Sequence, residues 1–196
     1  MEIRGLHFKH ILTDINARFT PGITLLVGKN GSGKSTLFDC MAGINTDYKG
    51  HITGNEGIVY LNQNIYFNGR LKAKDFVSFV LTLEGIKKPL TRFDEFIQAL
   101  GLAEFFRGKL DRPFGMLSGG ERRMTVIASV LLLQRKWYIL DEPFAGVDKE
   151  GKAAIIALTT QIAAQGHGVI LSDHDSGLAD MYPGARRLYM EDGKLV

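Results

Sequence analysis

Short apolar runs alternate with amphipathic stretches along this chain. Uninterrupted apolar runs, which are typical of strands covered on both faces, occupy residues 23–27, 57–61, 137–140 and 169–171. Apolar positions at helical spacing predict helices over residues 35–42, 73–83, 91–100, 118–134 and 149–164. Shorter or alternating segments predict further strands at residues 3–8, 14–19, 50–54, 187–190 and 194–196. Strands that alternate with helices in this way predict an α/β fold with a mostly parallel sheet.

The middle third of the chain lacks strand-like runs. Phenylalanines recur there at helical spacing, for example Phe76, Phe79, Phe93 and Phe96. Core packing is the favoured interpretation of these rings, and an aromatic cofactor box is the alternative. Thr91 is a candidate N-cap for the second of these helices. We therefore expect one domain over residues 1–196, with an α/β core at 1–65 and 135–196 and an inserted helical lobe at about 66–134.

The amino-acid composition indicates the class of protein and the compartment that suits it. The hydrophobic share of 45% and the charged share of 23% are ordinary for a soluble globular protein. A net charge of +3 is too small to argue for nucleic-acid binding. Cys40, the single cysteine, excludes an intramolecular disulfide and suits a reducing cytosol. Because no apolar run could cross a bilayer and no signal-peptide core is present, we expect another chain to supply any membrane span.

A glycine-rich segment between a predicted strand and a predicted helix carries the strongest chemical signal. Residues 28–36 fit the pattern Gly, any four residues, Gly-Lys-Ser/Thr. The backbone N–H groups of such a turn and the dipole of the following helix bind phosphates, and the lysine reaches the terminal ones. A turn that binds nothing is the disfavoured alternative. The predicted nucleoside-triphosphate contacts are Gly28, Asn30, Gly31, Ser32, Gly33, Lys34, Ser35 and Thr36, with the Ser35 hydroxyl on Mg²⁺.

Two adjacent carboxylates follow the buried strand at residues 137–140. Ligands collect at the carboxyl edge of open α/β sheets, where the phosphate loop also lies. We expect Asp141 to hold Mg²⁺ and Glu142 to orient or deprotonate the water that attacks the γ-phosphate. The alternative is a pair of acids that caps the turn before Pro143.

Polar residues also follow two other predicted strands. The Gln63 amide could reach the metal ion or the attacking water, although most glutamines at such positions are simply solvated. The His174 imidazole could contact the γ-phosphate or a water, although a single histidine is often structural. Their position at strand ends favours a place in the same site.

A second candidate anion site precedes the helix at residues 118–134. Ser118, Gly119, Gly120 and Glu121 leave several backbone N–H groups and one hydroxyl available at a helix N-terminus. The phosphate loop already places one helix N-terminus at the nucleotide. The second N-terminus, at residue 118, has no strand leading into it, and a single nucleotide does not need both. We therefore expect this site to serve the nucleotide of another subunit.

In this order, the motifs resemble those of the nucleotide-binding subunits of ABC (ATP-binding cassette) transporters, over essentially the whole chain. The family's Walker A motif matches residues 28–36, and its Q-loop glutamine matches Gln63. The signature motif matches residues 117–121, and Walker B with its catalytic glutamate matches residues 138–142. The D-loop matches residues 145–148 and the switch histidine matches His174.

The resemblance implies a P-loop NTPase cassette that hydrolyses ATP with Mg²⁺. It also implies a head-to-tail homodimer in which Walker A of one copy and the signature of the other hold each ATP, with Asp148 of the D-loop nearby. A small antiparallel N-terminal sheet and a helical lobe that contacts a separate transmembrane permease complete the expectation. An aromatic residue near the N-terminus should stack on adenine: Phe8 is the candidate, His7 and His10 are rivals, and a core role for Phe8 stays open.

Some features depart from the family pattern. The segment between residues 43 and 63 is short, which suggests that a strand or hairpin of the N-terminal sheet is missing. Glu121 stands where many members have glutamine. The compact arm and residues 140–148 look most like those of exporters, so we expect an exporter subunit. We also expect the chain to be cytoplasmic, on the inner face of the cell membrane, without direct nucleic-acid contact. A soluble ABC ATPase acting on nucleic acid or ribosomes is the alternative, and residues 117–121 argue against an ordinary P-loop kinase.

Overall fold

The computed structural model describes residues 1–63, 68–174 and 178–196, and the chain divides into two units. The first comprises Met1–Gln63, Arg135–Pro143 and Thr160–Val196, and the second Asn64–Gln134 and Phe144–Thr159. This division departs from the predicted boundaries in one main segment, because Phe144–Thr159 is grouped with the helical unit and not with the α/β core. Helix α6 (Lys149–Ala164) accordingly begins in the second unit, and its last turn belongs to the first.

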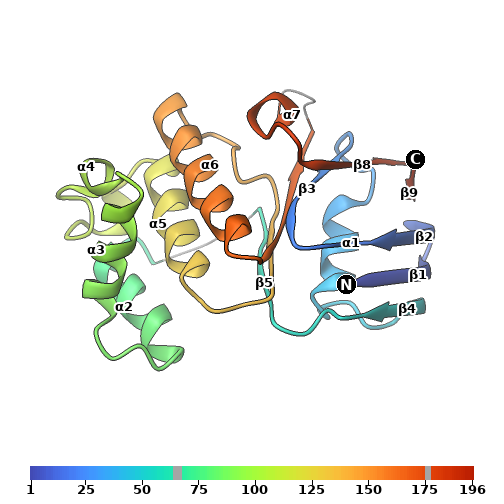
Figure 1. Cartoon of the computed structure of the whole chain (residues 1–196), viewed down its shortest axis with the longest axis horizontal. Helices are drawn as coiled ribbons and strands as arrows, with labels where there is room; N and C mark the ends of the chain where they lie inside the picture. Colours follow the sequence, from blue (N-terminus) through green and yellow to red (C-terminus); the bar gives the residue numbers. More distant parts are fainter. Residues whose placement is uncertain (64–67, 175–177) are drawn as a thin grey trace. The chain divides into compact units, whose positions relative to one another are not determined.

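A six-stranded sheet with the order β5-β6-β7-β3-β8-β9 forms the centre of the first unit. Its strands β5 to β8 and β3 run parallel, and only β9 pairs antiparallel, with β8 (Figure 1). The mostly parallel sheet predicted from the apolar runs is therefore confirmed. The strands are β3 (Gly22–Val27), β5 (Ile58–Leu61), β6 (Trp137–Leu140), β7 (Gly168–Asp173), β8 (Arg186–Glu191) and β9 (Lys194–Leu195).

Burial explains why the central strands are apolar throughout. All four residues of β6 are buried, as are the first five of β7. Trp137 lies opposite Gly168, where a Cβ atom would come within 2.1 Å of the tryptophan ring. Any side chain at position 168 would therefore displace the Trp137 ring.

A second, three-stranded antiparallel sheet has the order β2-β1-β4, which confirms the small N-terminal sheet. Its strands are β1 (Glu2–Phe8), β2 (Leu12–Arg18) and β4 (Lys49–Thr53), which lie side by side in Figure 1. Apolar residues of β1 and β2 share one hydrophobic core with helix α1 (Lys34–Met41) and with Trp137 and Ile139 of β6. This shared core fixes the N-terminal sheet against the element that follows the phosphate loop. The short helix α7 (Leu178–Met181) also belongs to this unit.

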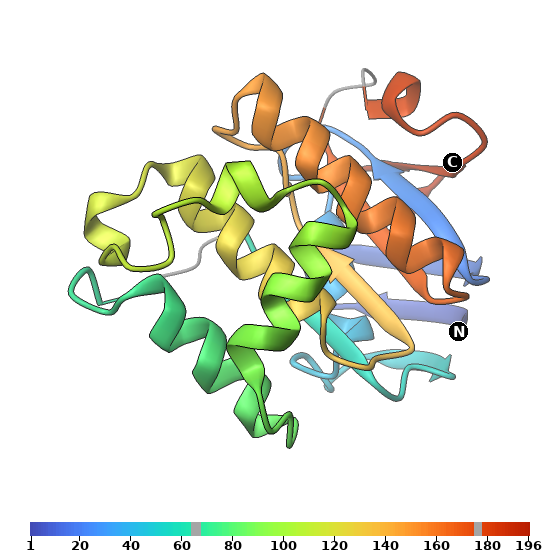
Figure 2. The ribbon, with the colours of Figure 1, turned by 60° about the vertical axis from the view of Figure 1, so that its left-hand side comes forward.

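The regular elements of the second unit, over its described residues 68–134 and 144–159, are helices, as the periodicity predicted (Figure 2). Its elements are α2 (Ala73–Leu83), α3 (Pro89–Ala99), α4 (Ala103–Phe106), the 3-10 turn η1 (Phe114–Met116), α5 (Gly119–Leu131) and most of α6. Phe93 and Phe106 are buried and meet edge to face, with ring centroids 5.3 Å apart. Phe76 meets Phe114 in the same way at 5.5 Å. Core packing, the favoured interpretation, therefore holds for Phe93, whereas Phe79 is 63% exposed and does not pack in the core.

Two helix ends differ from the prediction. Helix α3 begins at Pro89 with Lys88 as its N-cap, and not at Thr91. Proline is well suited to a first helical position because its fixed φ angle matches the helix and its missing N–H would have no partner there. Helix α5 ends at Leu131, before the predicted residue 134. Within the part of the chain that the structure describes, no helix has both the length and the hydropathy needed to cross a bilayer.

Candidate functional site

The phosphate loop connects β3 to α1 in the predicted way. Gly33, which precedes α1, has a φ of 105°, a conformation that side chains disfavour. A Cβ atom on Gly28 would lie 2.4 Å from the Met190 carbonyl oxygen. The loop therefore requires glycine at both positions, because one needs a left-handed backbone and the other lies directly against β8.

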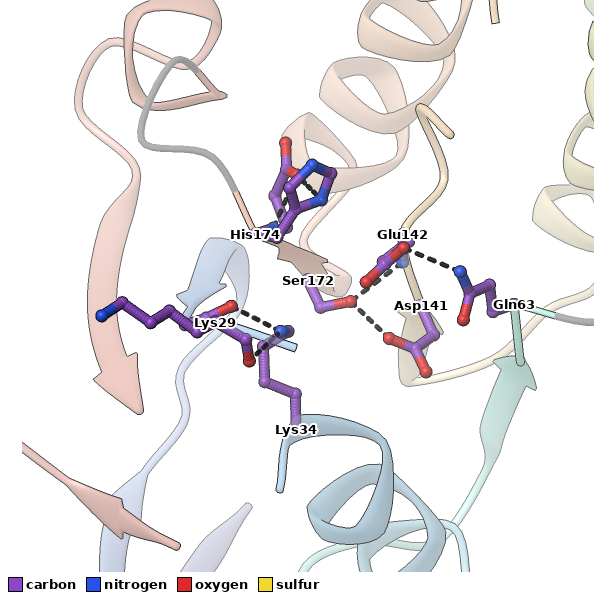
Figure 3. Close-up of polar contacts among 9 residues, drawn as sticks. Lys29, Lys34, Gln63, Asp141, Glu142, Ser172 and His174 are labelled. Atoms are coloured by element: carbon purple, nitrogen blue, oxygen red, sulfur yellow. Dashed lines mark hydrogen bonds and ion pairs between the residues drawn. The ribbon is translucent and has the colours of Figure 1, made fainter. Parts of the chain in front are cut away.

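Lys34 is buried beneath its own loop. Its Nζ atom donates hydrogen bonds to the carbonyl oxygens of Gly28 at 2.6 Å and Lys29 at 3.2 Å (Figure 3). A buried ammonium needs such partners, since desolvation of an unpaired charge is costly. Two neutral carbonyls leave the positive charge uncompensated, so the loop is electrostatically suited to an anion.

A cleft of about 390 Å³ opens beside this loop within the first unit. The Gln63 and Glu142 side chains line it together with the loop, so two of the predicted catalytic residues share one space with the predicted phosphate contacts. The lining residues are Ile11, Asn30, Gly31, Gly33, Lys34, Ser35, Thr36, Gln63 and Glu142. Ser32 is buried in the loop instead.

Asp141, at the end of β6, lies against the start of α1. The Ser35 hydroxyl donates to its Oδ2 atom at 2.6 Å, which joins the two predicted metal ligands directly. The Ser172 hydroxyl donates to the Oδ1 atom at 2.5 Å. A carboxylate and a hydroxyl side by side are oxygen ligands of the kind that Mg²⁺ prefers, so these residues fit the ion.

Ser172 was not identified from the sequence, although it touches both carboxylate residues. Besides donating to Asp141, its Oγ atom accepts the backbone N–H of Glu142 at 2.9 Å (Figure 3). The parallel register places Leu171 opposite Leu140, which brings the following serine beside the following aspartate. No motif marks such a serine, because a small polar residue in a buried strand carries no chemical signature.

Glu142 has a strained backbone. Its φ angle is 48°, in the left-handed region that few non-glycine residues adopt, and Pro143 follows it. Such a conformation costs about 1–3 kcal/mol and persists where surrounding contacts enforce it. The Ser172 hydroxyl holds the Glu142 N–H, and the Gln63 amide donates to the Oε2 atom at 2.9 Å. The carboxylate is thus held at both its backbone and its side chain.

His174 follows β7 at the predicted edge of the sheet, and its side chain is exposed. Its Nδ1 atom is 3.2 Å from Asp173 Oδ1, and its backbone N–H donates to the same oxygen at 2.7 Å. Within the described residues its polar contacts are therefore to Asp173, and not to Glu142 or the phosphate loop. The role of His174 at a phosphate stays a prediction.

Tyr60 of β5 is a further neighbour that the sequence did not reveal. Its hydroxyl lies close to the carboxylates of Asp39 of α1 and Asp141. Burial and then these two carboxylates raise the pKa of Tyr60 well above its usual range. The pKa of the Asp39 carboxyl is also raised, first by burial and then by the Asp141 charge. Tyr60 therefore remains a neutral hydrogen-bond donor between the two acids.

Phe8 does not have an open ring face, which corrects the first candidate for adenine stacking. It is 5% exposed and belongs to the hydrophobic core, and the Lys9 Nζ atom lies 4.9 Å from its ring centroid. The rivals His7 and His10 are exposed. Half-buried Ile11, which the sequence analysis did not single out, lines the cleft and offers an apolar surface there.

The start of α5, in the second unit, forms a capping box. The Ser118 hydroxyl accepts the Glu121 N–H at 3.1 Å, and Glu121 Oε2 accepts the Ser118 N–H at 2.8 Å. The Ser118 N–H, and more weakly Lys109, hold the pKa of Glu121 below its usual value. Gly119 and Gly120 leave the first two positions of the helix without side chains. The predicted second anion site therefore has an intact helix N-terminus, with the Glu121 carboxylate turned back on its own backbone.

Asp148 also caps a helix. Its Oδ1 atom accepts the Gly151 N–H at 2.8 Å, at the start of α6. This contact gives Asp148 a local structural role, and its predicted place near a nucleotide stays a prediction. Among the described residues, no cluster of three or more His, Cys, Asp or Glu side chains could hold a metal ion.

Comparison with known proteins adds independent information. A family profile described as ABC transporter matches residues 12–145. The cobalt import ATP-binding protein CbiO of Salmonella typhimurium is 32% identical over 186 residues, which cover 86% of this chain and 68% of that protein. The energy-coupling factor transporter ATP-binding protein EcfA of Methanocaldococcus jannaschii is 29% identical over 221 residues, which cover all of this chain and 77% of that protein.

A solved structure described as the ATP-binding subunit of an ABC transporter has the same fold. Its TM-score is 0.82 at 22% identity, over 99% of this chain and 87% of that one. The similarity extends over nearly the whole of both chains.

Proposed function

The chain belongs to the ABC transporter family as an ATP-binding ATPase subunit, and from this premise we propose that it hydrolyses ATP to drive a separate transmembrane partner. One observation carries the catalytic part of the proposal. The cleft beside the phosphate loop contains Glu142, held by Gln63 and Ser172, opposite the loop that holds Lys34. A base and a phosphate-binding lysine thus lie in one cleft.

The phosphate loop would bind the ATP triphosphate through its backbone N–H groups and Lys34. The residues that would hold Mg²⁺ are Ser35 and Asp141, which already lie 2.6 Å apart, and Gln63 lies in the same cleft. When bound, the ion would supply positive charge to the β- and γ-phosphates. The Ser172 hydroxyl and Tyr60 would keep the Asp141 carboxylate oriented.

Glu142 would act on the attacking water. Its carboxylate accepts the proton of the water, while the Gln63 amide restrains one of its two oxygens. The left-handed backbone of Glu142 fixes the direction in which this side chain leaves β6. His174 would complete the site by contacting the γ-phosphate, after leaving its contact with Asp173.

A second copy of the chain would complete each nucleotide site. The cleft in the first unit has its own base and phosphate loop, whereas Ser118, Gly119 and Gly120 offer an additional helix N-terminus. In a head-to-tail homodimer the start of α5 of one copy would face the triphosphate bound to the other, with Asp148 nearby. ATP binding would then close the dimer and hydrolysis would reopen it.

The names of the relatives support a transmembrane partner and favour one direction of transport. CbiO is named a cobalt import ATP-binding protein, and EcfA is named an energy-coupling factor transporter ATP-binding protein. These names support a transmembrane partner on another chain and a position on the inner face of the membrane. They favour uptake, and we propose uptake in place of the export that residues 140–148 suggested. The partner selects the cargo.

Co-purification tests the partner. Tagged chain, isolated from detergent-solubilised membranes of its own cells, should bring down a polytopic membrane protein in the presence of ATP and Mg²⁺. Exclusively cytosolic chain that carries nucleic acid would contradict the transport function and favour the soluble alternative. Transport assays in membrane vesicles then distinguish the two directions. Accumulation of cargo in inverted vesicles indicates export, and accumulation in right-side-out vesicles indicates uptake.

A further inference from the structure

A lysine outside every recognised motif lies beside the start of α5. The Lys109 Nζ atom is 3.4 Å from Glu121 Oε1 and 3.9 Å from the centroid of the Phe105 ring. The two charged side chains are only 21% and 25% exposed. All three residues belong to the second unit, so these contacts lie inside one compact body. An ion pair that is largely shielded from water, and supported by an aromatic face, is more than a chance surface contact.

Glu121 creates an electrostatic conflict at this helix N-terminus. A carboxylate in the first turn stabilises the helix through the dipole and, here, through the capping box with Ser118. The same negative charge repels any anion that binds to the N–H groups of Gly119 and Gly120. Glutamine could form the capping box without that charge. A chain with glutamate at this position therefore needs a compensating cation close by.

We propose that Lys109 is a positioning residue that neutralises Glu121 and thereby keeps the start of α5 able to bind a triphosphate held by a second copy of the chain. This inference rests on the proposed head-to-tail assembly. Both carboxylate oxygens are held in the structure, Oε2 by the Ser118 N–H and Oε1 by Lys109. The Phe105 ring positions the ammonium, and the loop between α4 and η1 supplies it.

The test compares Lys109→Met with a matched variant, Lys74→Met, in the full-length chain. Lys74 forms another ion pair of the same unit, with its Nζ atom 2.7 Å from Asp111 Oδ1, and both partners are more exposed than Lys109 and Glu121. We expect Lys109→Met to raise the KM for ATP about tenfold, which corresponds to about 1.4 kcal/mol of binding free energy. Its kcat at saturating ATP should change little, and Lys74→Met should leave both constants unchanged.

A double-mutant cycle separates neutralisation from a general structural effect. The Lys109→Met/Glu121→Gln double variant carries no charge at either position, as the neutralised pair does in sum, so it should recover the wild-type KM that Lys109→Met alone has lost. Lys109→Arg, which keeps the charge, should retain the wild-type KM. A double variant whose KM stays as high as that of Lys109→Met, with no rescue by Glu121→Gln, would overturn the proposal. If Lys109→Met fails to fold, Lys109→Gln serves for the same cycle, with thermal melts as the check.

The assembly is tested in parallel. ATPase activity per chain should rise with protein concentration, because two copies form each site. Activity independent of concentration, with Ser118→Ala unimpaired, would overturn the assembly and with it the role of Lys109. Concentration-dependent activity in which Lys109→Met keeps the wild-type KM would overturn the role of Lys109 alone.

Discussion

Replacing Ser172 by alanine tests whether the Glu142 backbone is held where catalysis needs it. The change removes a hydroxyl that donates to Asp141 at 2.5 Å and accepts from the Glu142 N–H at 2.9 Å. Ser172 is 0% exposed, so water cannot replace it. An unsatisfied buried donor costs about 1–3 kcal/mol, and a lost hydrogen bond to a charged group about 1.5–3 kcal/mol.

We expect Ser172→Ala to lower the free energy of unfolding by about 3 kcal/mol, near the lower end of the summed range, because the two costs overlap. For a chain of this length, that loss corresponds to a decrease in Tm of about 6–12 °C. Once its N–H is released, Glu142 can relax from a φ of 48°, which displaces its carboxylate. A displacement of about 1 Å reduces kcat by up to about 100-fold, with a smaller effect on KM.

The matched control is Ser129→Ala. Ser129 is also 0% exposed, and its hydroxyl donates to the Thr125 carbonyl oxygen at 2.7 Å within α5. It contacts none of the cleft residues, so we expect kcat to change by less than about twofold. Steady-state ATPase kinetics and thermal melts of both variants provide the data. If Ser172→Ala keeps the kcat of the control, Ser172 does not position the catalytic carboxylate.

The remaining predictions concern Phe8 and Glu121. Phe8→Leu should lower the free energy of unfolding by about 1–1.5 kcal/mol, because the smaller side chain fills the core less well. The KM for ATP should stay unchanged, because the Phe8 ring is buried. An increase in KM with no loss of stability would restore the stacking role. Because the folded-state pKa of Glu121 is lowered, its ionised form stabilises the chain above pH 4.5, and that contribution is lost as the pH falls through the lowered pKa. Urea unfolding at pH 7 and pH 3 should therefore show a stability difference between wild type and Glu121→Gln that shrinks in acid, and a constant difference would refute this assignment.

The sequence predicted the parts of the site that depend on one segment. The phosphate loop needs only a strand, glycines and a helix in succession, and all three are where the pattern placed them. Asp141 and Gln63 were predictable because each ends an apolar run, and parallel strands bring their carboxyl ends together. Periodicity likewise predicted α2 over its full length.

The remaining parts depend on register and packing between distant segments. Ser172 meets Asp141 because β7 pairs with β6 in one particular register, and Tyr60 lies between two acids for a similar reason. Lys109 lies in the loop between α4 and η1, and secondary-structure propensities do not predict the path of such a loop. Phe8 was a candidate for adenine stacking because an aromatic residue at the end of a strand has the same sequence pattern whether its ring is buried or open. It ends β1, the central strand of the small sheet, and its ring is buried. The predicted export direction is not confirmed, and a named relative is an import protein.

Hydrolysis by Glu142→Gln tests the central claim most directly, that the cleft beside the phosphate loop is the site of ATP hydrolysis. The substitution keeps the shape of the side chain and the possible contact with Gln63, but removes the base. We predict unchanged affinity for ATP and a kcat reduced by at least about 100-fold. Glu95→Gln, an exposed glutamate paired with Arg92, should behave as wild type. Wild-type turnover by Glu142→Gln would contradict the account.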